Sequence, residues 1–155
     1  MRRSILLLAL LSSLSALADP ATPPVAKWTL LDQNDKPYTL DNDAQVLLVA
    51  RSMAAAKLVN AAIDDAPEGY LEARNVLYVA DIEKMPSLIK LVAVPAMRSA
   101  KYRILLDREG RVAGQYGGDR ETVQWLALKD GAVVREQRFT DGEQLKQAIA
   151  KQPHQ

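Results

Sequence analysis

Apolar residues along this chain occur as short continuous runs and as longer stretches with helical spacing. Residues 46–50 are a wholly apolar run that passes into an Ala-rich stretch at 54–65, where apolar residues recur at helical spacing. This pattern predicts a buried strand that leads straight into a helix, which ends before Pro67. The helix would begin at the carboxyl end of the strand, where open α/β sheets usually bind their ligands. Residues 51–57 are therefore the first candidates for a site.

Further strands are predicted by the same apolar patterning. A continuous run at residues 75–81 predicts a buried strand parallel to the first, because a helix of about three turns separates the two. The remaining runs that predict strands lie at residues 27–31, 38–40, 102–106, 123–128 and 132–139. The last two runs flank Lys129-Asp130-Gly131 and predict a hairpin, since Asp-Gly suits a tight turn.

Three more helical segments are expected. One would begin with Pro86 as its first residue and end at Pro95. Its apolar residues are Leu88, Ile89, Leu91 and Val92. A turn or two of helix is expected at residues 111–116, and the capping-box spacing of Thr140 and Glu143 predicts a final helix. Strands and helices in this order predict an α/β fold with a mixed sheet.

The first residues of the chain have the pattern of a secretory signal peptide. Arg2 and Arg3 form a basic region, residues 5–11 an apolar region, and Ala16-Leu17-Ala18 a cleavage signal. The apolar part is shorter than the roughly 20 residues that span a bilayer. We therefore expect cleavage after Ala18, no membrane span in the mature chain, and a periplasmic or secreted protein.

The remaining residues predict one domain. Residues 19–26 are rich in Pro and small side chains and predict a flexible mature N-terminus, residues 27–152 form the domain, and 153–155 form a tail. Cleavage would remove two of the 20 basic residues and leave 18 against 19 acidic ones, a net charge near −1. That balance gives nucleic acid or anionic lipid no overall basic excess to bind.

The chain contains no cysteine and one histidine, His154. Disulfide chemistry, thiol nucleophiles, thiolate metal sites and a lipoprotein anchor are therefore not expected. A metal site could use only carboxylates, and Asp64, Asp65, Glu68 and Glu72 are more simply the solvated end of a helix. Gly117-Gly118 lacks the motifs that cradle phosphates, so no NAD, flavin or ATP cofactor is expected.

Three segments resemble the thioredoxin-like superfamily, in its peroxiredoxin and periplasmic branches. They are WTLLDQNDKPYTLDNDAQVLLVA (28–50), YRILLDREGRVAGQYG (102–117) and WLALKDGAVVREQRF (125–139). The resemblance implies a thioredoxin-like mixed sheet with helices on both faces and a C-terminal hairpin followed by a helix. It also implies that residues 52–57 stand where these families carry their redox cysteines, and that a cis-proline would stand near Thr122 and Val123.

This chain departs from the resemblance at both redox positions, because neither a cysteine nor that proline is present. Arg51-Ser52 at the strand end, Ala56-Lys57 and Asn60-Ala61 are similar to the cysteine-free exported group typified by YtfJ. That group has no firmly assigned activity. The resemblance therefore implies a fold and a compartment, and no reaction.

The candidate binding residues are Arg51, Ser52, Met53, Lys57, Arg120 and Thr122. Ser52 is the hydroxyl at the strand-to-helix junction, but a nucleophilic serine needs a base and the one histidine lies in the tail, so a helix cap is favoured. The arginines and Lys57 could hold an anion, although scattered surface charges are often only solvated. No residue is assigned to catalysis.

We therefore expect a protein without redox activity that binds a peptide, a protein partner or a small ligand at the former active-site end of the sheet. A hydrolase or transferase built on Ser52 and the helix N-terminus is one alternative. The other is an accessory subunit of an envelope complex, which would expose an apolar patch of several hundred Å² away from the junction.

Overall fold

A computed structural model describes residues 27–154. The predicted signal peptide, its cleavage position and the predicted flexible residues 19–26 lie outside the described residues. In the described part a seven-stranded sheet has the order β2-β1-β5-β4-β3-β6-β7. The strands are β1 (Thr29–Asp32), β2 (Pro37–Thr39), β3 (Val46–Ala50), β4 (Val76–Asp81), β5 (Leu105–Asp107), β6 (Val123–Lys129) and β7 (Ala132–Phe139).

The centre of the sheet is parallel and its edges are antiparallel. β3 pairs with β4, and β4 with β5, as parallel neighbours, with Val46 opposite Val76 and Ala50 opposite Ala80. β6 is antiparallel to β3, and β6 and β7 form the predicted hairpin. Asp130 and Gly131 turn this hairpin with positive φ angles of 51° and 80°, as a tight hairpin turn requires.

Alternate residues of the central strands divide the core into two layers. Val46 and Leu48 of β3 pack with one apolar cluster, and Leu47 and Val49 with the other. Because both faces are buried, the strand is apolar at every position rather than at every second one. This burial explains the continuous apolar run that the sequence predicts as a strand.

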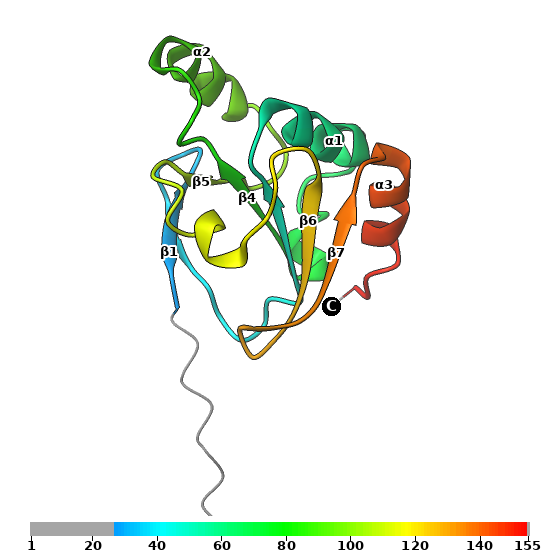
Figure 1. Ribbon diagram of the computed structural model, residues 1–155. Helices are drawn as coiled ribbons and strands as arrows, with labels where there is room; N and C mark the ends of the chain where they lie inside the picture. Colours follow the sequence, from blue (N-terminus) through cyan, green and yellow to red (C-terminus); the bar gives the residue numbers. More distant parts are fainter. Residues whose placement is uncertain (1–26, 155) are drawn as a thin grey trace, which may run out of the picture.

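The α-helices lie against one face of the sheet. α1 (Met53–Ile63) and α3 (Gly142–Ala150) are side by side in Figure 1, and Gly142 allows a close approach because a Cβ there would lie 3.1 Å from that of Ala61. α2 (Ser87–Met97) contributes Val94 to the same cluster. The other face is covered by the short 3-10 helix η2 (Ala113–Tyr116) and by loops, so the expected second helical layer is only this short helix in the described residues.

Several predicted boundaries move for local physical reasons. Pro95 does not end its helix, and that prediction was wrong: α2 continues to Met97, because a proline in the last turn removes only its own N–H bond. Pro86 is the residue before the helix rather than its first residue. α3 is capped by Asp141, whose carboxylate accepts from the Gln144 N–H at 2.9 Å, and not by Thr140.

β5 begins three residues later than predicted because a side chain replaces the strand ladder there. The buried Gln33 accepts from the Ile104 N–H at 2.9 Å and donates to the Tyr102 carbonyl at 2.7 Å. The remaining short helix is η1 (Glu72–Arg74), between α1 and β4. No helix within residues 27–154 has the length and apolar character needed to cross a membrane.

Candidate functional site

The junction of β3 and α1 is built as the sequence predicts. β3 ends at Ala50, and Ser52 in extended conformation is the N-cap of α1, with its hydroxyl oxygen accepting from the Ala55 N–H at 3.1 Å. The same hydroxyl donates to the carbonyl of Arg120. Ser52 therefore has its proton and one lone pair committed to structure, as the capping interpretation expects.

Arg51 joins three segments at this edge. Its Nε lies 3.0 Å from Oδ2 of Asp81, at the end of β4, and its Nη1 donates to the Gly118 carbonyl at 2.7 Å. The Asp81 side chain is only 1% exposed. A carboxylate so deeply buried needs a cationic partner, so Arg51 is committed to Asp81 and to the loop rather than to solvent.

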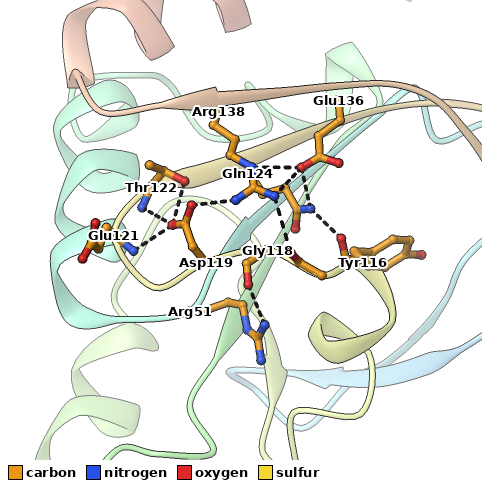
Figure 2. A network of polar contacts seen from close by, with 10 residues as sticks. Arg51, Tyr116, Gly118, Asp119, Glu121, Thr122, Gln124, Glu136 and Arg138 are labelled. Carbon is orange, nitrogen blue, oxygen red and sulfur yellow. Dashed lines mark hydrogen bonds and ion pairs between the residues drawn. The ribbon is translucent and has the colours of Figure 1, made fainter.

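Residues 117–122 form a loop that is pinned by a polar network, which Figure 2 shows around Asp119. Asp119 Oδ1 accepts from the Thr122 and Glu121 N–H groups and from the Thr122 hydroxyl, and Oδ2 lies 2.6 Å from Nη1 of Arg138. These donors, the Thr122 N–H first, hold the pKa of Asp119 well below its usual range. The loop that would carry a cis-proline in a thioredoxin is thus fixed by side-chain bonds, and residues 27–154 contain no cis peptide bond.

Gln124 extends this network beneath the loop. Its buried amide donates to the Tyr116 carbonyl at 2.8 Å and to Glu136 at 3.1 Å, and Glu136 also pairs with Arg138 (Figure 2). The Gln124 and Arg138 donors lower the pKa of Glu136. The loop is therefore anchored to both strands of the β6–β7 hairpin and, through Arg51, to β4.

A cavity of about 890 Å³ opens on the other side of the junction, between α1 and α2. Its apolar lining includes Met53 and Ala56 of α1, Ile89, Ala93 and Met97 of α2, and Met85. Its size falls in the range of small-molecule sites, which are typically concave and mostly apolar. Residues of the β3–α1 junction therefore border a hollow in the surface.

Charge is unevenly distributed around this cavity. Its basic residues are Lys57, Lys84, Lys101 and Arg120, and its acidic residues are Asp64 and Asp81. Asp81 is already paired with Arg51, which leaves the lining with a cationic excess. A negatively charged group would be favoured at this rim.

Two tyrosines form part of the cavity wall. The Tyr102 hydroxyl donates to Oδ1 of Asn60 at 2.7 Å, and the Tyr102 ring lies 6.2 Å from that of Tyr78. Burial raises the pKa of both phenols above the usual value. They are therefore neutral hydrogen-bonding groups at physiological pH and not bases.

The structure brings four of the six predicted binding residues to the cavity: Ser52, Met53, Lys57 and Arg120 line it. Arg51 and Thr122 do not line it, because they hold Asp81 and Asp119. The α2 wall of the cavity was not predicted from the sequence. A partial signal was present, since Ile89 is one of the apolar residues predicted on this helix and it does line the cavity.

No catalytic set accompanies Ser52. His154 contacts Arg74, its Nε2 lying 2.6 Å from Nη2, and Arg74 ends η1 just before β4, at the opposite end of the sheet. Among residues 27–154 no three His, Cys, Asp or Glu side chains form a group that could hold a metal ion. With no thiol in the sequence, the junction offers hydrogen bonds, cations and apolar surface.

Comparisons with known proteins place this architecture. No family in a scan of known protein families matches the chain, and no curated protein does. Solved structures match over most of their length. The exposed lipoprotein thioredoxin Etrx1 of Streptococcus pneumoniae is 19% identical, with a TM-score of 0.53 over 81% of this chain and 99% of that one. The chain has a thioredoxin-like fold.

Two further solved structures agree. StoA of Bacillus subtilis is 14% identical, with a TM-score of 0.54 over 79% of this chain and 96% of that one. Peroxidoxin BcpB of Mycobacterium tuberculosis is 18% identical, with a TM-score of 0.54 over 82% and 92%. These likenesses extend to the fold alone. The narrower resemblance to the YtfJ group stays a prediction. A thioredoxin-like fold without cysteine is consistent with a protein that has no redox activity.

Proposed function

We propose that this protein is an exported, non-redox binding protein whose cavity between α1 and α2 holds an amphipathic ligand with an anionic group. The observation that supports this most directly is an apolar cavity of about 890 Å³ with a cationic rim at the end of the sheet where redox relatives carry cysteines. The methionines, Ile89 and Ala93 would contact the apolar body of the ligand. Lys57, Lys101 and Arg120 would attract its charge.

The two walls of the cavity support different parts of this role. Ser52 and Arg51 fix the loop that carries Arg120, so the backbone that bears this charged side chain is held in place before a ligand arrives. Preorganised groups lose little freedom on binding, which favours affinity. The methionine-containing α1–α2 side is adaptable, because methionine side chains fill irregular shapes.

Binding is tested directly with anilinonaphthalene sulfonate, an amphipathic anion whose fluorescence rises in apolar surroundings. We expect saturable binding that Ala93→Phe weakens by about tenfold, because the ring fills the cavity. Ala54→Phe is the matched control, since Ala54 is an exposed α1 residue outside the lining. Equal binding by both variants, with unchanged circular dichroism, would contradict the proposal.

Charge recognition is tested separately. Lys57→Gln combined with Lys101→Gln should lower the affinity for the sulfonate by about tenfold, while Lys129→Gln combined with Lys151→Gln should leave it unchanged. Native mass spectrometry of the protein purified from the cell envelope without harsh washing then identifies the natural ligand. A ligand-free spectrum together with no sulfonate binding would reject the proposed cavity function.

Export is supported by the basic, apolar and Ala-x-Ala regions at the start of the sequence. N-terminal sequencing of the protein isolated from the periplasm should give Asp19 as the first residue. A protein retained in the cytoplasm with an intact N-terminus would contradict this part of the proposal.

A further inference from the structure

The outer face of α2 carries large aliphatic side chains in contact with solvent. Leu88, Leu91 and Val92 are 78%, 73% and 73% exposed. They lie at helical spacing on one side of the helix, and the buried residue of α2 is Val94, in its C-terminal half. A helix that is apolar on almost every side is normally buried on every side, so this exposed face is an anomaly.

This face is separate from the cavity described above. Of the exposed aliphatic residues on α2, Ile89 lines the cavity, whereas Leu88, Leu91 and Val92 do not. In Figure 1 α2 stands at the margin of the fold, beyond the end of β4, so its outer face is open to a large flat partner. The aliphatic contact therefore does not depend on a ligand in the cavity, whereas Lys84 and Lys101 line the cavity and would serve both surfaces.

Charge around α2 identifies the class of partner. Residues 84–103 contain five basic side chains, Lys84, Lys90, Arg98, Lys101 and Arg103, and no acidic one. The whole chain is almost neutral, so this segment carries a local positive charge that the net charge of the chain does not reveal. Lys84 lies before the helix and Lys101 after it, so cations flank the exposed apolar stripe at both ends, while Arg98 lies 3.8 Å from Asp35 and is shared with it.

Aliphatic side chains exposed on one side of a helix, with basic residues before and after it, suit a helix that lies on a membrane surface. The aliphatic residues enter the acyl boundary, and the cations meet anionic headgroups. We propose that α2 docks this protein on an anionic lipid surface, with Leu88, Leu91 and Val92 as the inserted residues. An acidic protein partner would fit the charge too, but it would not require three aliphatic side chains so fully exposed on one small helix.

The absence of cysteine makes a local test possible, because one introduced thiol is the only label position. Leu91→Cys and, as a control on the exposed face of β7, Val134→Cys are each labelled with an environment-sensitive fluorophore in the full chain. Vesicles of phosphatidylcholine with phosphatidylglycerol should shift emission to the blue at position 91 and leave position 134 unchanged. Vesicles of phosphatidylcholine alone, or high salt, should abolish most of the shift.

A second arm removes the proposed contact. Leu88→Gln, Leu91→Gln and Val92→Gln together should lower partitioning of the α2 region, reported by a label at Ala96→Cys, by at least about a hundredfold. The matched control replaces the exposed Leu31, Val133 and Val134 by Gln and should change nothing. No blue shift at position 91 on anionic vesicles would overturn the proposal. So would self-association in solution that the α2 triple variant abolishes, because α2 would then be a contact between copies.

Discussion

The two walls of the cavity are held in opposite ways. Hydrogen bonds and an ion pair that involve Arg51, Ser52, Asp119 and Arg138 fix the loop at residues 117–122. Little of the surface of this loop is apolar. α2 is apolar almost throughout, and Val94 is its one fully buried side chain. Hydrogen bonds therefore set the position of the loop, the rigid wall. Packing on one side alone sets the position of α2, the adaptable wall. A site built this way combines a rigid charged edge with an adaptable apolar one.

The largest effect should come from breaking the rigid wall at Arg51. Arg51→Ala leaves the Asp81 carboxylate buried without its cation, and loss of one partner of a buried pair typically costs about 3 kcal/mol of unfolding free energy. Urea denaturation measures this loss. Adding Asp81→Asn to Arg51→Ala should recover part of the lost unfolding free energy. If the losses caused by the two substitutions simply add, the Arg51–Asp81 pair is not what holds the loop.

The same substitution in the two helices should give different results. Val59→Ala in α1 removes a side chain that is 0% exposed and should lower the unfolding free energy by about 2 kcal/mol. Val92→Ala in α2 should change it by less than about 0.5 kcal/mol, because the side chain already meets solvent. Equal losses would mean that α2 is packed as firmly as α1.

Ser52→Ala tests the cap and the serine-enzyme hypothesis together. Losing the N-cap bond should lower the unfolding free energy by about 1 kcal/mol, and Ser52→Thr should restore most of it because threonine keeps the hydroxyl. Sulfonate binding should persist in both variants. Abolition by Ser52→Ala of a hydrolytic turnover present in the natural protein would instead support the alternative of an enzyme built on this hydroxyl.

The smallest effect concerns acid. Because its donors, first the Thr122 N–H, hold the pKa of Asp119 below that of the unfolded chain, its stabilising contribution is complete above the unfolded pKa. The contribution is lost as the pH falls through the acid range. The difference in urea midpoint between the natural protein and Asp119→Asn should therefore shrink steadily below about pH 4. A difference that is constant with pH would show that the ionised carboxylate is not responsible.

Much of the sheet and of the β3–α1 junction was predictable, and the role of α2 as a cavity wall was not. The apolar run at residues 46–50, the Ser52 cap and the Asp130-Gly131 turn are local signals, because strand burial, capping and turn geometry depend on neighbouring residues. Arg51 was correctly placed at the junction, but its partner Asp81 lies 30 residues away in the sequence, and only the parallel pairing of β3 with β4 brings the two together.

The failures have one physical origin, which is tertiary context. A glutamine far along the chain shortened β5, and a proline was tolerated in the last turn of α2. The net charge of the whole chain also gave no sign of the basic segment at residues 84–103, because acidic residues elsewhere in the sequence balance its charge.

The single buried anchor of α2 bears on how fast a ligand exchanges. A helix held by Val94 and the partly buried Met97 should open locally at a much lower free energy than the central strands do. The ligand would then enter and leave the cavity as α2 opens and closes locally, while the loop bound by Arg51 keeps its position. Amide hydrogens of residues 87–97 should exchange with deuterium well before those of β3 and β4, and an occupied cavity should slow them selectively.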